Sequence, residues 1–160
     1  SAGWKQPLRA AMDKLSMLID MEYETACTNA GLDPWLLRND YVRVFLGDIS
    51  FESWINEKLQ GQTDASKTEK LHNLLLSEYE CQRMFNSCAW FFDDLERIEP
   101  RNSIICAAHA AWLTKAATGT DVAVKIIPLL DQSRNGNGHS SASKLFLASY
   151  GRYSLSTRPH

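Results

Sequence analysis

The apolar residues near the start of the chain recur at intervals of three and four positions. Between residues 4 and 29 they form one stripe: Leu8, Ala11, Met12, Leu15, Leu18, Ile19, Met21 and Ala26. This spacing places them on one face of an α-helix, and such a face is stable only when it is buried. Pro7 lies near the start of the range and Gly31 just past its end, where helices tolerate these residues best. The pattern therefore predicts one long amphipathic helix.

The same period returns further along the chain, separated by residues that typically cap helices. The expected helices are 33–47, 50–59, 67–95, 101–117 and 121–130. Asp33 followed by Pro34 is typical of a helix start, and Ser50 and Asp121 are expected to cap the helices that follow them. Together with the first helix, these ranges predict an all-α fold of five to six helices in an irregular bundle.

Proline or glycine residues are expected to end or kink three of these helices. Glu99-Pro100 should end or kink the helix over 67–95, because proline disfavours helical backbone at the residue before it. Gly119 should stop the helix over 101–117. Pro128 should kink or close the helix after Asp121.

The C-terminal part of the chain is more polar than the rest. Residues 131–143 are rich in Gly, Asn and Ser and predict a loop. Residues 144–150 fit either a helix or a strand, and the tail through His160 is expected to be loose. We therefore expect a helical bundle domain over residues 1–130, followed over 131–160 by a polar loop and a loosely packed segment.

Composition excludes several classes of protein. The chain has 160 residues, 44% of them hydrophobic, which excludes intrinsic disorder and is enough for a buried core. Seventeen Lys and Arg against nineteen Asp and Glu give no dense basic surface, so we expect no nucleic-acid partner. No apolar run approaches the ~18 residues of a membrane span, so we expect no membrane partner either.

The four cysteines form no metal-binding pattern, since no CxxC pair occurs. Three of them lie in apolar helical stretches, where a thiol behaves as a small hydrophobic residue. Cys106 and His109 share a helix face, but two ligands do not make a zinc site, and a core thiol beside a hydrogen-bonded histidine is expected. We predict no metal or other cofactor and a cytoplasmic location, although an even number of cysteines leaves disulfides open. The chain begins with Ser1 rather than Met, and we expect either a cut-out or a processed piece of a longer polypeptide.

The densest chemical cluster is the run Trp90-Phe91-Phe92-Asp93-Asp94. On a helix these three aromatic side chains would point in directions about 100° apart, so at least one should face a second contact surface. One interpretation is a helix buried on two sides, with both acids in solvent. The other is a sugar site, in which Trp90 stacks on the apolar face of a ring and Asp93 or Asp94 accepts hydrogen bonds from hydroxyl groups.

The same two acids are a poor catalytic pair. A glycosidase needs two carboxyl groups on opposite sides of the scissile bond, about 5–5.5 Å or 6.5–9.5 Å apart, and neighbours on one helix point apart. We therefore predict no catalytic residue in this chain. Asn135, Asn137 and His139 form a polar loop that either borders a cleft or is a solvated connection.

Residues 87–94, Ser-Cys-Ala-Trp-Phe-Phe-Asp-Asp, resemble a known family motif. The motif reads Ser/Thr-Cys-Gly-Trp-Phe-Phe-Asp-acid, followed within several residues by Ile-Glu, and Ile98-Glu99 follows here. It belongs to the helical domain of unknown function that follows the catalytic barrel in certain α-amylase/α-mannosidase-like proteins of glycoside hydrolase family 57. Residues 7–12, 33–41 and 105–113 are also similar to that domain, whereas Ala89 replaces its glycine.

This resemblance implies an accessory role beside a catalytic barrel that carries the nucleophile and the acid. The expected partners are that barrel, as part of the parent polypeptide, and an oligosaccharide in a cleft lined by Trp90, Asp93 and Asp94. The alternative is a stand-alone helical bundle that binds a protein through its aromatic face. A sugar or a barrel predicts a concave groove with polar groups, and a protein partner predicts a flatter apolar patch. Self-association of the isolated piece is compatible with both.

Overall fold

The computed structural model describes residues 3–156, and every regular element in this range is helical. The elements are α1 (Lys5–Asn29), α2 (Pro34–Asp40), α3 (Val42–Phe45), α4 (Phe51–Lys58), α5 (Ala65–Met84), the 3₁₀-helix η1 (Ser87–Phe91), α6 (Ile98–Thr118), α7 (Ala123–Gln132) and α8 (Ala142–Ser156). The all-α prediction is confirmed. The expected number of five to six helices is too low, because the chain breaks at Tyr41 and again after Met84 and forms a helix near its end.

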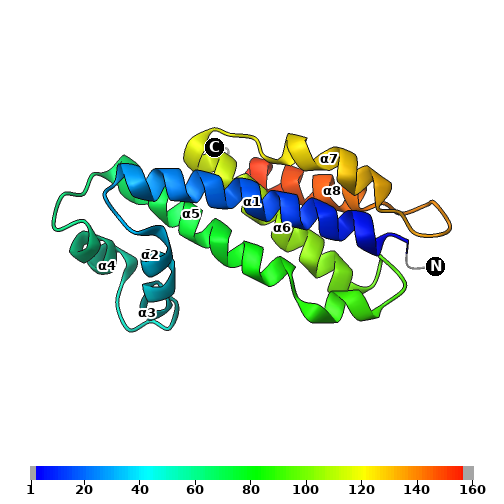
Figure 1. The fold of residues 1–160 in the computed structure, drawn as a ribbon, viewed down its shortest axis with the longest axis horizontal. Coiled ribbons are helices and arrows are strands. Elements are labelled where there is room, and N and C mark those ends of the chain that lie inside the picture. The colour runs from blue at the N-terminus through cyan, green and yellow to red at the C-terminus, as the bar shows by residue number, and fades with distance from the viewer. Residues whose placement is uncertain (1–2, 157–160) are drawn as a thin grey trace.

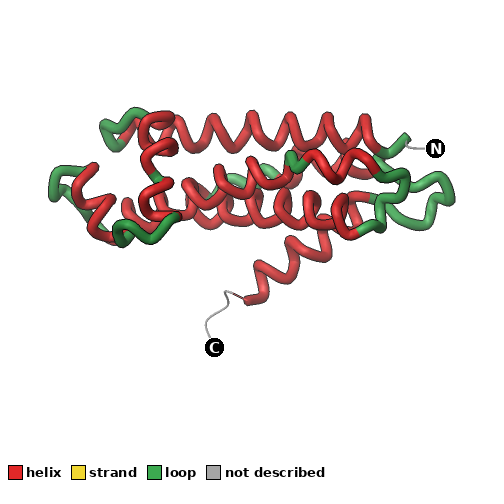
Figure 2. The backbone as a smooth tube through the Cα atoms, turned by 90° about the horizontal axis from the view of Figure 1, so that it is seen from below, coloured by secondary structure: helices red, strands yellow, loops and turns green. Residues whose placement is uncertain are grey.

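The long helices form the body of the bundle (Figure 1). α5 packs mainly on α6, α6 also packs on α8, and α1 lies against α7 and α5. The short helices α2, α3 and α4 lie at the end of the body opposite the N-terminus. Figure 2 shows that the C-terminal end of α8 projects away from the other helices. The fold is therefore elongated, with a different set of connecting segments at each end.

The core consists of two clusters along α1. Leu8, Leu15 and Ile19 belong to the first, which α1 shares with α6, α7 and α8, and Tyr23 and Cys27 belong to the second, which it shares with α4 and α5. The stripe predicted for α1 is confirmed at Leu8, Ala11, Met12, Leu15, Ile19 and Ala26, which are all buried. Met21, also placed in that stripe, is 58% exposed, because the buried face continues through Tyr23 instead.

Several helix ends lie where the capping residues predicted them. The Asp33 carboxylate accepts hydrogen bonds from the backbone N–H groups of Trp35 and Leu36, each at 3.0 Å, and Pro34 is the first residue of α2. Gly119 ends α6 in the left-handed conformation at φ 76°, which glycine adopts without steric cost. The Ser50 hydroxyl caps α4 by accepting from the backbone N–H of Ser53.

Asp121 was expected to cap the helix after it, and this is wrong. α7 begins at Ala123, and its N-cap residue is Val122, which has no capping side chain. Asp121 instead accepts a hydrogen bond from the hydroxyl of Tyr150 and forms an ion pair with Lys115. Its carboxylate therefore joins α6 to α8. Pro128 lies inside α7 and does not end it.

The expected helix over 67–95 is corrected at its C-terminal end. α5 ends at Met84, and the side chain of Asn86 then accepts a hydrogen bond from the backbone N–H of Cys88 at the start of η1. Pro100 does not end or kink this helix but lies in the first turn of α6. Proline fits there because the first N–H groups of a helix have no partner within it.

The C-terminal segment packs onto the body. Residues 144–150, left open between helix and strand, lie in α8. Ala142 and Phe146 are fully buried in the same cluster as Leu8. The beginning of α8 is therefore part of the main core, whereas the domain boundary after residue 130 stays a prediction. The tail expected to be loose is described only through Ser156, and residues 157–160 lie outside the described range.

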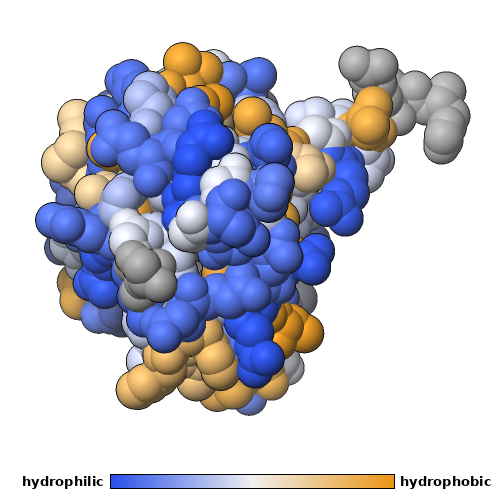
Figure 3. All heavy atoms as spheres, turned by 90° about the vertical axis from the view of Figure 1, so that its right-hand side faces the viewer, coloured by the Kyte–Doolittle hydropathy of each residue, from blue (hydrophilic) through white to orange (hydrophobic). Residues whose placement is uncertain are grey.

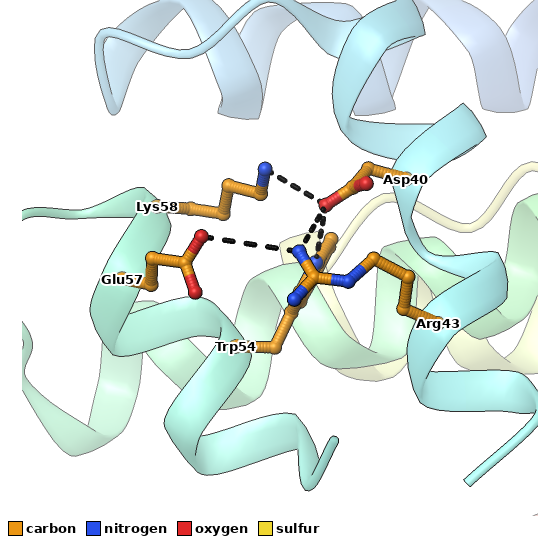
Figure 4. A network of polar contacts seen from close by, with 5 residues as sticks. All are labelled: Asp40, Arg43, Trp54, Glu57 and Lys58. Atoms are coloured by element: carbon orange, nitrogen blue, oxygen red, sulfur yellow. Dashed lines mark hydrogen bonds and ion pairs between the residues drawn. The ribbon is translucent and has the colours of Figure 1, made fainter. Parts of the chain in front are cut away.

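A polar network joins α2 and α3 to α4 (Figure 4). One oxygen of Asp40 accepts a hydrogen bond from the indole N–H of Trp54 at 2.9 Å and lies 2.8 Å from Nζ of Lys58. Arg43 lies 3.3 Å from the same oxygen and 3.9 Å from Glu57. The hydrogen bonds from Lys58 and Trp54 lower the pKa of Asp40 to about 2. Asp40 is thus the centre of this contact.

Candidate functional site

Two connecting segments meet at the end of the bundle where α1 begins (Figure 1). Residues 86–97 lie between α6 and Phe85, the residue that caps the end of α5, and residues 133–141 connect α7 to α8. The indole N–H of Trp4 donates to the backbone oxygen of Asp93 at 3.0 Å, and the hydroxyl of Ser133 donates to the backbone oxygen of Trp4 at 2.7 Å. Trp4 is fully buried. It therefore attaches both segments to α1.

Asn135 joins the two segments to each other. Its side-chain oxygen accepts from the backbone N–H of Leu95, and its NH₂ group donates to the carboxylate of Asp94, each at 2.8 Å. Asp94 also accepts from the backbone N–H of Glu96 at 2.9 Å. The hydrogen bonds from Glu96 and Asn135 favour the charged form and so lower the pKa of Asp94, and the bond from Glu96 has the larger effect. Asp94 is thus an oriented carboxylate anion at neutral pH.

The two segments enclose an open polar hollow of about 190 Å³. Its lining consists of Asp93, Asp94, Glu96, Asn135, Gly136 and Asn137. Asp93 is exposed and lies 3.5 Å from Nζ of Lys5, while the hydroxyl of Ser140 donates to Glu96. Carboxylates accept hydrogen bonds and carboxamides both accept and donate. The hollow can therefore bind hydroxyl or amino groups.

Trp90 does not line this hollow. Its ring stacks on Trp4, with the centroids 6.2 Å apart and the planes at 22°, and the guanidinium of Arg9 lies 5.8 Å from its centroid. Its indole nitrogen is buried and has no hydrogen-bond partner within residues 3–156. The structure thus brings Asp93 and Asp94 together and places Trp90 in the contact between η1 and α1.

Phe91 is the aromatic residue that faces outward. Its exposed fraction is 81%, whereas Phe92 is half-buried, with the guanidinium of Arg97 4.8 Å from its ring centroid. Phe91 is thus free to face a second contact surface, and that expectation stays a prediction. Its α-helical reason is wrong, because Trp90 and Phe91 lie in a 3₁₀-helix and Phe92 follows it. Ile98 is also exposed. Figure 3 shows this end of the molecule as mainly hydrophilic, with hydrophobic residues gathered along its lower edge.

A buried charged cluster, which the sequence analysis missed, lies between α1, α2 and α5. The side chain of Glu78 is 2% exposed, and Nη1 of Arg38 donates to its Oε2 at 3.3 Å. The pKa of Glu78 is raised to about 8, first by burial and then by the neighbouring carboxyl group of Asp20, against the opposing effect of Arg38. A sequence signal was present, because Glu78 continues the buried positions Leu71, Leu74 and Leu75 at helical spacing.

The predicted pair of Cys106 and His109 belongs to a second buried acid cluster. Nδ1 of His109 lies 3.7 Å from Glu80, whose side chain is 9% exposed, and His109 stacks on Tyr153. Cys106 is a buried free thiol, and burial raises its pKa to about 11. Within the described residues, no three His, Cys, Asp or Glu side chains are grouped as metal ligands would be.

Comparisons with known proteins place the chain in a family without a known function. No curated protein and no solved structure matches the chain. None of the helices within residues 3–156 has the length and apolar character needed to cross a membrane. A family model matches residues 1–148, which is most of the chain. The protein therefore belongs to the family described as Domain of unknown function (DUF3536).

Proposed function

We propose that the chain is a non-catalytic helical accessory segment of a family-57-like glycoside hydrolase, which packs against the catalytic barrel and helps to shape a carbohydrate-binding cleft. The resemblance of residues 87–94 to the motif of that domain supports this role. The proposal rests on one observation at the end of the bundle where α1 begins. There the segment 86–97 supplies both the exposed ring of Phe91 and the acids of the polar hollow.

A sugar matches these groups, because it presents an apolar C–H face and a rim of hydroxyl groups. Polar side chains that orient a ligand work best when they are themselves held in place. Asn135 holds Asp94 and Leu95, and Trp4 holds Asp93, so the hollow is preformed. Phe91 takes the stacking role that the sequence assigned to Trp90, while Asp93 and Asp94 keep their role as hydrogen-bond acceptors.

The carboxyl groups support binding rather than hydrolysis. A glycosidase acid needs a raised pKa to remain protonated near neutral pH. The pKa of Asp94 is lowered, and the carboxyl group with a raised pKa, Glu78, is buried in α5 and held by Arg38. The catalytic pair is therefore expected on the barrel.

Two variants test this role in the complete polypeptide that carries the segment. Phe91→Ala and Asp94→Ala are expected to raise KM for an oligosaccharide substrate about three- to tenfold with little change in kcat, since each removes one binding contact. Val124→Ala is the control for Phe91, because Val124 is an exposed apolar residue on α7. Asp48→Ala is the control for Asp94, because Asp48 is an exposed acid before α4.

The outcome separates the proposal from its alternative. Unchanged KM values for both variants, with the folded chain intact, would remove the carbohydrate role. If Phe91→Ala instead abolished binding of another protein and oligosaccharide turnover stayed normal, the stand-alone bundle with an aromatic contact face would replace it.

A further inference from the structure

A second polar pocket, of about 270 Å³, lies between the end of α5 and the start of α6. Its lining consists of Gln82, Arg83, Asn86, Asn102, Ser103 and Cys106. The pocket has no carboxylate in its lining and is separate from the hollow at Asp94. The segment 86–97 is common to both, because it contributes Asn86 here and three acids there.

Arg83 is held in place by a buried carboxylate. Its Nη1 lies 2.9 Å from Oε1 of Glu80, which His109 approaches from α6. Glu80 balances the charge of Arg83, so the pocket carries no unpaired charge. A guanidinium has five N–H donors, and those not used by Glu80 remain available to a ligand. This arrangement favours an uncharged ligand that accepts hydrogen bonds over an anion.

Ser103 supplies a buried hydroxyl that has no hydrogen-bond partner within residues 3–156. The residue is 2% exposed and lines the pocket. A buried polar group without a partner is unfavourable, so most such groups in folded proteins are paired with protein, water or a ligand. The pocket is the side from which a partner can reach this hydroxyl.

Three carboxamides complete the lining. The side-chain oxygen of Asn86 accepts from the backbone N–H of Cys88 at 3.1 Å, which fixes the side chain and leaves its NH₂ group to donate. Gln82 and Asn102 are exposed and can each donate and accept. Hydroxyl groups of a ligand also donate and accept. They therefore match carboxamides better than a ligand carboxylate, which only accepts, or a ligand ammonium group, which only donates.

We infer that this pocket binds one ring of an uncharged polyhydroxylated ligand, a single sugar residue of an oligosaccharide. Its volume lies below the ~300–1,000 Å³ of pockets for drug-sized ligands, as a one-ring subsite requires. The ligand class rests on the proposed function, whereas the position of the subsite rests on the residues above. The pocket would give the segment 86–97 a second carbohydrate contact, besides the hollow at Asp94.

The test is a ¹H–¹⁵N NMR titration of the full chain with maltotriose and with α-mannobiose. Saturable shifts are expected at the side-chain amides of Gln82, Asn86 and Asn102. Ser103→Ala should weaken binding about two- to tenfold, as the loss of one hydrogen bond does, with an equal or higher Tm because it removes an unpaired buried hydroxyl. Asn137→Ala, which changes only the other hollow, should leave the affinity of this pocket unchanged.

Three results would overturn the inference. Shifts confined to residues 93–97 and 135–137 would remove this subsite and leave the proposed function in place. A response to sodium sulfate, but to neither sugar, would show an anion site instead. The absence of shifts with both sugars would also reject the subsite, whereas the proposed function would still be decided separately by the KM of the Phe91 and Asp94 variants.

Discussion

At the scale of single residues, the least expected feature is the carboxyl group of Glu78 in the core. Its position follows the apolar stripe of α5, so an acid there is visible in the sequence. Its environment is not, because Asp20 and Arg38 come from α1 and α2 and only the folded chain brings them to Glu78. Two carboxyl groups with one guanidinium form a neutral set only when one carboxyl group is protonated.

The raised pKa of Glu78 predicts a pH dependence of stability. Its pKa is about 8 in the folded chain against a usual value of 4.5. The contribution of Glu78 to stability is therefore fully present below pH 4.5, and it decreases as the pH rises to about 8, by at most about 1.4 kcal/mol per pH unit. Glu78→Gln should flatten this part of the profile in urea unfolding between pH 5 and 8. Glu24→Gln, at an exposed acid on α1, should keep the wild-type slope; equal slopes for both variants would contradict the assignment.

At the scale of elements, three local capping signals placed helix ends correctly, whereas the one at Asp121 did not. Asp33, Ser50 and Gly119 act on residues two to four positions away, so their helix ends could be predicted from the sequence. The end of α5 could not be predicted in this way, because the helical pattern continues through residue 95. What replaces the helix is the packing of Trp90 on Trp4, a contact between residues far apart in the chain.

The short helices at the far end are expected to depend on Asp40. Asp40→Asn removes the charge that holds Lys58 and Arg43, so α4 should open locally more often. We expect about 0.5–1 kcal/mol less protection of the α4 amides in hydrogen exchange, a value typical of partly exposed ion pairs. The pKa of Asp40, lowered to about 2, implies that its contribution is present above pH 3.8 and is lost as the pH falls through 2. Asp13→Asn, which breaks the exposed pair with Arg9 on α1, should leave the α4 amides unchanged. If Asp40→Asn also left the protection of the α4 amides unchanged, the role of Asp40 would be refuted.

At the scale of the whole molecule, the candidate site depends on contacts across most of the chain. The sequence singled out Asp93 and Asp94, which line the hollow. It did not decide whether the loop of Asn135 borders a cleft or is only a solvated connection between helices. It could not show that Asn135 orients Asp94, since they lie 41 positions apart. It also assigned the stacking role to Trp90, because no local pattern shows that Trp4 covers that ring. Residue types were therefore predictable, whereas their arrangement follows from tertiary packing.

Trp4 is the residue through which α1 controls this end of the bundle. Trp4→Phe keeps an aromatic ring but removes the N–H group that donates to the backbone oxygen of Asp93. We expect a loss of about 1–2 kcal/mol in the free energy of unfolding, from one hydrogen bond and some packing. Amides of residues 86–97 should exchange faster and their NMR signals should broaden, while those of α4 should not change. Trp112→Phe, at a half-buried tryptophan on α6, is the control. If the Trp4 variant lost the same stability but left the 86–97 amides unaffected, Trp4 would serve only the core, and the hollow at Asp94 would be held by Asn135 alone.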